Sequence, residues 1–261
     1  MLASLTRHLL RCAVCLGVHL ALASALQVAT AASDAQHSTW VALAGTELDP
    51  RARAALAQIR GADRRLLALR AYLRAGAALQ TRWSWTQAQI AAYASTPEGI
   101  AAAADIEAVA AAFAAANPGF TLHVNRMPRS LELQIAHWND NRSVGSTATA
   151  LVSALDRQLG THAGAPDPAS LRSALINWAP SRAAALAAPG LSAHGQARAF
   201  DFQVERSGQV VAGLDAASAR QQWDAAGWTQ RLHAAVDKAG GRFSGPLAQP
   251  YEPWHYAYTA R

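Results

Sequence analysis

The alternation of apolar and polar positions predicts that the first two thirds of the chain are mostly helical. Asp49 and Pro50 have the residue types of a helix N-cap and first helical position. The leucines and isoleucine that follow recur at roughly helical intervals, with a break predicted at Gly61. Apolar spacing and stop signals predict further helices at residues 83–93, 96–117, 131–138, 147–159 and 171–188, the last broken at Pro180.

Short strands are predicted mainly in the last third of the chain. Residues 120–125 and 199–204 alternate apolar and polar side chains, as half-buried strands do. Ser207-Gly208 predicts a tight turn into a hairpin partner. The pattern also predicts that hairpin partner at 209–212, a helix at 216–239, and extended segments at 242–247 and 255–258. This layout predicts an α+β fold in which a helical N-terminal region precedes a domain of short strands and helices.

The N-terminal segment indicates where the protein works. Arg7 and Arg11 precede a stretch of almost wholly apolar or small residues that runs from Cys12 to Ala32 and ends in small-residue cleavage sequences. We expect residues 1–32 to be a signal peptide, so that the mature protein is exported to the periplasm or cell envelope. Membrane attachment is expected only if the segment remains as an uncleaved anchor. Both cysteines lie inside it, so the mature chain would have no disulfide and no thiol nucleophile.

The charge balance argues against nucleic acid as a partner. The chain has 23 Lys and Arg against 17 Asp and Glu, with Lys238 as the one lysine. Removing Arg7 and Arg11 with the signal peptide leaves a modest positive excess that is spread along the chain without a basic run. Such an excess suits a protein that works beside anionic wall polymers, and it lacks the clustered charge of a nucleic-acid site.

Two short segments contain the residues most able to bind a metal or to act in catalysis. His194 stands seven positions before Asp201, where a loop of small residues enters an alternating strand. Glu252 stands three positions before His255. Two histidines and one aspartate form a three-ligand zinc site with a position left for water, and a nearby glutamate is the natural base for that water. We therefore predict Zn²⁺ on His194, Asp201 and His255, with Glu252 as the catalytic base.

The same segments resemble a known family. They read Ser192-Ala193-His194-Gly195-Gln196-Ala197-Arg198-Ala199-Phe200-Asp201 and Glu252-Pro253-Trp254-His255. These are similar to the signatures Ser-x-His-x-x-Gly-x-Ala-x-Asp and Glu-x-Trp-His of the D-Ala-D-Ala metallopeptidases, which include the vancomycin-resistance D,D-carboxypeptidases and dipeptidases. Arg129-Ser130, followed by Glu132 and Gln134, resembles the family's Arg-Ser run, whose Arg holds the substrate's terminal carboxylate. The resemblance covers roughly residues 97–261.

The resemblance implies both a fold and an activity. The fold is the LAS-type zinc peptidase fold, a small antiparallel sheet flanked by helices at 96–261, with residues 33–95 as an N-terminal helical extension. The activity is a zinc-dependent D,D-carboxypeptidase that hydrolyses the terminal D-Ala-D-Ala bond of peptidoglycan stem peptides. It places Arg129, Gln134, Ser192 and Trp254 on the substrate side of the site.

Departures from the family pattern leave alternatives open. Ala197 replaces a family Gly, Pro128 stands where Tyr usually precedes the Arg, and residues 141–188 are longer than in compact members. Arg182 and Arg198 are rival candidates for holding a carboxylate. The alternative functions are an endopeptidase or L,D-peptidase with the same zinc centre, a wall-binding module with structural zinc, and a metal-free relative that has lost activity.

Overall fold

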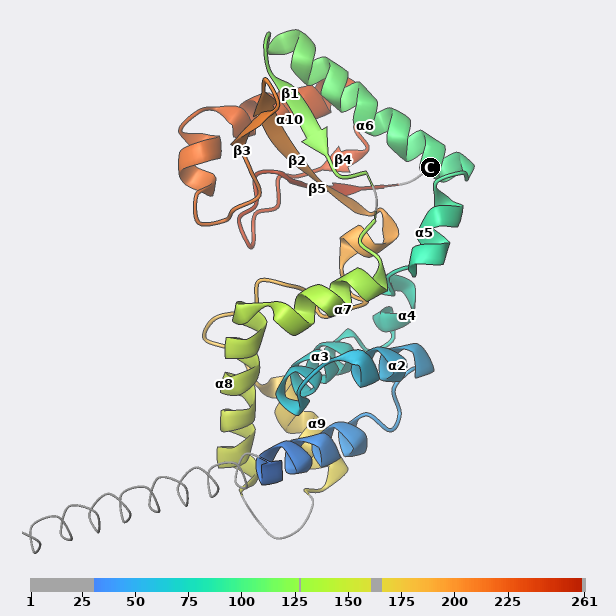
Figure 1. Cartoon of the computed structure of the whole chain (residues 1–261), viewed down its shortest axis with the longest axis vertical. Helices are drawn as coiled ribbons and strands as arrows, with labels where there is room; N and C mark the ends of the chain where they lie inside the picture. The colour runs from blue at the N-terminus through green and yellow to red at the C-terminus, as the bar shows by residue number, and fades with distance from the viewer. Residues whose placement is uncertain (1–30, 127, 161–165, 260–261) are drawn as a thin grey trace, which may run out of the picture. The chain divides into compact units, whose positions relative to one another are not determined.

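The computed structural model describes residues 31–126, 128–160 and 166–259 (Figure 1). Almost all of the predicted signal peptide, with both cysteines, lies outside the described residues. Within the described residues, 31–44 are helical. The α+β class and a small antiparallel sheet, both predicted from the sequence, are confirmed.

The chain divides into two compact units. The first comprises Met1–Ala75 and Asn141–Leu186, and the second comprises Gly76–Asp140 and Ala187–Arg261. This division differs from the boundary at residue 95 expected from the sequence. The segment 141–186 belongs with the N-terminal helices because the helices within this segment pack against them.

The first unit, in its described part, is built of helices. They are the helix at 31–44, α2 (Pro50–Gln58), α3 (Ala62–Ala75), α8 (Arg142–Leu159) and α9 (Pro168–Asn177). α8 and α9 both pack on α3. Their facing sides supply an aliphatic core of Leu66, Leu69, Leu151, Leu155, Leu171 and Leu175. Burial of these leucines holds together two segments that are distant in the sequence.

All the strands found among the described residues belong to the second unit. Its elements are α4 (Ala78–Arg82), α5 (Gln87–Tyr93), α6 (Pro97–Ala116), β1 (Thr121–Val124), α7 (Leu131–Asp140), η1 (Ala193–Gln196), β2 (Ala199–Arg206), β3 (Gln209–Ala212), η2 (Arg220–Asp224), α10 (Trp228–Ala239), β4 (Phe243–Ser244) and β5 (His255–Tyr258). The strands pair antiparallel in the order β1-β2-β5-β4, and β3 pairs with β2.

The alternation along β2 separates a core face from an open face. Phe200, Phe202 and Val204 are buried, whereas Asp201, Gln203 and Glu205 are partly accessible. The buried face belongs to a core shared with α6 and α10, which pack against one another. The sheet therefore presents Asp201 on the face opposite this core.

Helix α6 is long and apolar enough to cross a membrane, judged by length and composition alone. Its start and end agree with the predicted signals: Thr96 caps the N-terminus, and the helix ends before Asn117. Ile106, Val109 and Phe113 are buried in the core of the second unit, so this apolar composition has a packing explanation within the fold.

Several predicted helices differ from the structure. Residues 83–86 are extended, and the helix begins only after Thr86, whose side chain forms a capping box with Gln89. α9 ends at Asn177, and residues 178–188 contain no helix; Pro180 lacks a backbone N–H and disfavours the helical conformation of Ala179. The predicted helix at 216–239 is interrupted at Gly227, which has a φ of 72°.

Candidate metal centre

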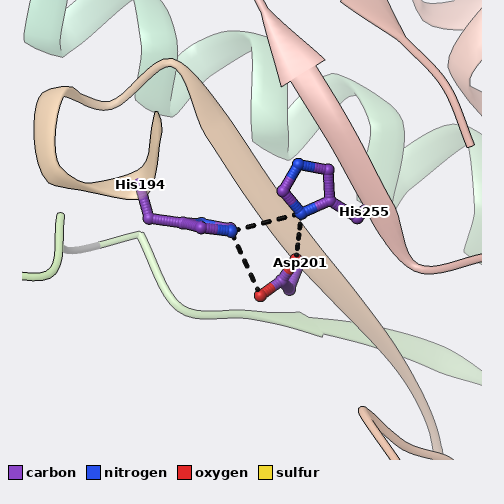
Figure 2. A group of neighbouring side chains, drawn as sticks. All are labelled: His194, Asp201 and His255. Carbon is purple, nitrogen blue, oxygen red and sulfur yellow. Dashed lines mark hydrogen bonds and ion pairs between the residues drawn. The ribbon is translucent and has the colours of Figure 1, made fainter. Parts of the chain in front are cut away.

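Strand pairing places two of the predicted ligands side by side. Asp201 on β2 is the register partner of His255 on β5, and both side chains point to the open face of the sheet (Figure 2). Directly opposite residues on one face have Cβ atoms about 4.5–5.5 Å apart, so their side chains meet. The His255 Nδ1 atom lies 3.0 Å from Asp201 Oδ1.

The third ligand comes from the short turn that precedes β2. His194 lies in η1, which ends at Ala197 with a left-handed backbone of φ 53°. Alanine tolerates this conformation less well than glycine does. The turn directs His194 over the start of β2, where its Nε2 atom lies 3.2 Å from His255 Nδ1 (Figure 2).

The three side chains have the geometry of a metal site. One possible ligand atom from each of His194, Asp201 and His255 lies within 4.8 Å of the others, so this group could hold a metal ion. The remaining separation, from His194 Nε2 to Asp201 Oδ2, is 3.5 Å. Zinc bonds of roughly 2.0–2.1 Å arranged as a tetrahedron would place ligand atoms about 3.3 Å apart. The three separations of 3.0, 3.2 and 3.5 Å lie near that spacing, with Asp201 contacting His255 through Oδ1 and His194 through Oδ2.

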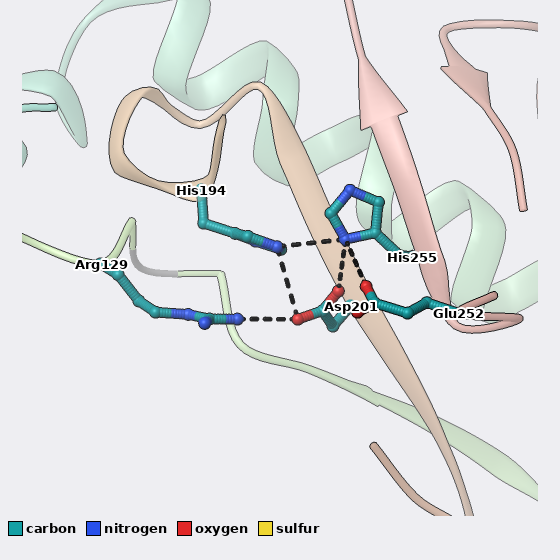
Figure 3. Close-up of polar contacts among 5 residues, drawn as sticks. All are labelled: Arg129, His194, Asp201, Glu252 and His255. Carbon is teal, nitrogen blue, oxygen red and sulfur yellow. Dashed lines mark hydrogen bonds and ion pairs between the residues drawn. The ribbon is translucent and has the colours of Figure 1, made fainter. Parts of the chain in front are cut away.

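Arg129 and Glu252 flank this group (Figure 3). Arg129 Nη2 donates a 2.8 Å hydrogen bond to Asp201 Oδ2. The other guanidinium donors of Arg129 have no partner among the residues that the structure describes. The Glu252 Oε2 atom lies 3.6 Å from His255 Nδ1, although Glu252 is not part of the ligand group itself. This carboxylate thus stands beside the three-residue group.

Burial, neighbouring charges and hydrogen bonds shift the pKa values of His194, Asp201 and Glu252. Burial lowers the pKa of His194 to about 4, and the positive charges of Arg129 and His255 contribute to the shift. Burial opposes ionisation of Asp201, but the hydrogen bond from His255 and the nearby cations outweigh it and lower its pKa. Burial raises the pKa of Glu252, and the charge of Asp201 adds to that effect. At neutral pH the His194 imidazole is therefore uncharged and the Asp201 carboxylate is ionised. These are the protonation states in which the two side chains can bind a metal.

Gln134 links the Arg129 segment to the His194 loop. Its Nε2 donates to the Arg129 carbonyl at 2.7 Å, and its Oε1 accepts from the Gly190 N–H at 3.0 Å. The Arg129 N–H in turn donates to the His194 carbonyl at 3.1 Å. Both ends of the Gln134 amide are thus engaged by the protein, and a contact with substrate stays a prediction.

The other two residues expected on the substrate side occupy different environments. Trp254 is buried and packs near Trp223, with ring centroids 6.1 Å apart, and its carbonyl accepts from the Phe202 N–H. Ser192 precedes η1, and its carbonyl accepts from the Gly195 N–H. Trp254 therefore packs in the core of the second unit, Ser192 is partly accessible, and a substrate contact by either residue stays a prediction.

A segment that the sequence interpretation missed holds the His194 loop in place. The N–H groups of Ser84 and Trp85 donate to the carbonyls of Gly190 and Gly195, each at 2.9 Å. A Cβ at Gly195 would lie 2.0 Å from Ser84 Oγ. The sequence feature that could have identified this segment is the Thr86–Gln89 capping pair, because a helix N-cap shows that the residues before it are not helical.

Among the described contacts, neither rival arginine has a side-chain contact with His194, Asp201 or His255. Arg182 belongs to the first compact unit, and Arg198 is exposed at the turn between η1 and β2. Among the described residues, His194, Asp201 and His255 form the one group with metal-binding geometry. Comparison of the chain with protein-family models, with curated proteins and with solved structures found no match.

Proposed function

We propose that this protein is a zinc-dependent D,D-carboxypeptidase that removes the terminal D-alanine from peptidoglycan stem peptides after export to the cell envelope. The main support is that His194, Asp201 and His255 lie close enough together to hold a metal ion. Glu252 beside this group and the motif resemblance to the D-Ala-D-Ala metallopeptidases add to the case. The LAS-type fold is part of the same proposal.

The donor set fits zinc. Two imidazole nitrogens and one carboxylate oxygen are ligands that zinc accepts, and three protein ligands leave a position for water or substrate. When bound, zinc would supply a water of lowered pKa and polarise the scissile carbonyl. A structural site normally has four protein ligands. The three-ligand group of the described residues therefore favours a catalytic centre over a wall-binding module.

The chain's own residues would carry the proton and orient the substrate. Glu252 takes a proton from the attacking water and delivers it to the leaving amine. Burial raises the pKa of Glu252. A general base transfers protons most effectively when its pKa lies near the working pH, so this shift favours the role. Asp201 is held in place by the Arg129 and His255 contacts, which fix its oxygens for coordination.

Arg129 gives the proposal its carboxypeptidase character. Its guanidinium has five donors, and the Asp201 contact involves only Nη2. The side chain is partly exposed, at 34%, so it is open to a ligand. A planar guanidinium can hold the free carboxylate of a stem peptide through two parallel hydrogen bonds. Substrates with a free C-terminus would thereby be preferred.

The test is incubation of the purified full chain with defined muropeptides, followed by mass spectrometry of the products. We expect loss of one terminal alanine, abolished by a chelator and restored by zinc. Glu252→Ala should retain zinc by elemental analysis but lose about 10²- to 10⁴-fold in turnover. Glu107→Ala, an exposed carboxylate on α6, is the matched control.

Two results would contradict the proposal. Cleavage within cross-links, with terminal alanines left intact, would identify an endopeptidase in place of a carboxypeptidase. Full activity in the presence of chelator, or absence of zinc from the purified protein, would remove the metallopeptidase assignment.

A further inference from the structure

The first compact unit carries a concentration of positive charge. Its described residues include eleven arginines and no lysine, against six aspartates and glutamates. The described residues of the second unit have more acidic than basic side chains. The positive excess of the chain therefore resides in the unit that does not contain the candidate metal centre, which points to an anionic ligand there.

A groove in this unit offers a defined place for such a ligand. Its cavity has a volume of about 400 Å³ and lies among the helix at 31–44, α2 and the start of α3. Ala42, Leu56 and Ala57 contribute apolar lining, and Gly45 lies beside them. The volume falls within the range of about 300–1,000 Å³ that is usual for small-molecule sites.

Two arginines from different helices line the groove. Arg53 Nη1 donates to the Thr46 carbonyl at 3.1 Å. Arg65 donates to the Gly61 carbonyl at 3.3 Å and to Ser38 Oγ at 3.4 Å. These acceptors are all neutral, and within the described part of the chain neither guanidinium has a carboxylate at ion-pair distance, although the charge of Arg53 also interacts with Asp49. Both cations thus retain charge that an acidic ligand would satisfy.

The lining favours carboxylates on a small peptide over a phosphate. Phosphate sites are commonly built from converging backbone N–H groups at helix N-termini or glycine-rich loops. Here the cationic groups are side chains, and small apolar residues make up much of the remaining surface. Such a surface accommodates methyl-sized side chains, while each guanidinium can hold a carboxylate bidentately.

We propose that this groove binds a short peptide of small side chains with free carboxylates, as a second, non-catalytic site for wall peptides. The identification with wall peptides rests on the proposed function, whereas the ligand class rests on the groove itself. A peptide held at the first unit would raise the local concentration of substrate for the metal centre if both sites engage one wall fragment.

The test measures binding of fluorescein-labelled Ala-Glu-Ala-Ala to the full chain by fluorescence anisotropy, with chelator present to stop hydrolysis. Arg53→Gln and Arg65→Gln should each weaken binding by about 10- to 100-fold, the usual worth of a charge-assisted hydrogen bond. Ala57→Leu keeps the charge but fills the groove, and it should weaken binding by about tenfold or more.

The matched control is Arg51→Gln. Arg51 lies on α2 and bonds to Asp49, and it does not line the groove. Its loss removes the same charge but should change the dissociation constant by no more than about twofold. An amidated Ala-Gln-Ala-Ala probe should bind at least tenfold more weakly than the acidic probe. Circular dichroism melting verifies that each variant is folded.

Some results would overturn the inference. Equal weakening by Arg51→Gln and Arg53→Gln, together with no effect of Ala57→Leu, would show diffuse charge attraction without a groove. Equal binding of the amidated probe would remove the carboxylate requirement. If muropeptides are hydrolysed but the groove variants bind normally, this inference alone fails. If groove-dependent binding occurs without any hydrolysis, the proposed function alone fails.

Discussion

Replacing Gln134 with alanine tests whether this side chain acts by holding the site loops together. Gln134 is 7% exposed and bridges the Arg129 carbonyl to the Gly190 N–H. Alanine removes both hydrogen bonds at once and leaves the two backbone groups without protein partners. The resemblance placed Gln134 on the substrate side, so the variant separates a positioning role from direct substrate contact.

The magnitude follows from those two backbone groups. A buried donor or acceptor left unsatisfied costs about 1–3 kcal/mol. Arg129 is partly open to water, which reduces the cost of its freed carbonyl, and Gly190 is buried. We therefore expect the free energy of unfolding to fall by about 2–4 kcal/mol. At about 2–4 °C per kcal/mol, the melting temperature should fall by roughly 4–16 °C.

The assay is urea unfolding of metal-free protein, followed by circular dichroism and tryptophan fluorescence. Working without metal removes any contribution of ligand binding to stability. Gln80→Ala on α4 is the matched control because Gln80 is exposed. An unfolding free energy within about 0.5 kcal/mol of wild type would refute the positioning role. A raised KM with unchanged stability would instead identify Gln134 as a substrate contact.

Two further predictions concern the loops around the site. Arg129→Lys should lower kcat/KM for substrates with a free C-terminal carboxylate, through a loss of about 2–5 kcal/mol of transition-state stabilisation. The kcat/KM for C-terminally amidated analogues should change little. Equal cleavage of both substrate types by the wild-type protein would argue against this role. Gly195→Ala should destabilise the protein by about 1–3 kcal/mol, because its Cβ would lie 2.0 Å from Ser84 Oγ. Ser84→Gly in the same chain should recover much of that loss in a urea-unfolding double-mutant cycle, and strict additivity would contradict the proposed clash.

The sequence was most informative where local signals were strong. Asp49 and Thr96 start helices as predicted, and the strand at 199–204 lies within β2. The helix predicted to start at Thr147 begins earlier, at Arg142, where Asn141 supplies the N-cap. Capping and alternation are properties of a few adjacent residues, so they can be recognised without knowledge of the fold.

Tertiary relationships were harder to predict. The apolar leucines of the 141–186 segment have ordinary helical spacing, which does not reveal that they share a core with α3. Likewise, nothing in the local pattern indicates that Ser84 and Trp85 pair with the loop around His194. Such pairings depend on where distant segments meet, and helical periodicity specifies only which side of each segment is buried.

The candidate metal centre was predictable because its sequence spacing is tied to strand register. Asp201 and His255 face one another only when β2 and β5 pair as they do here, with Phe200 opposite Tyr256 on the core side. A slip of one residue would exchange the two faces and turn Asp201 into the hydrophobic core, at a large desolvation cost. Burial of Phe200, Phe202 and Tyr256 therefore fixes the register that brings the ligands together. The apolar residues between the motif positions are thus as necessary to the site as the ligands themselves.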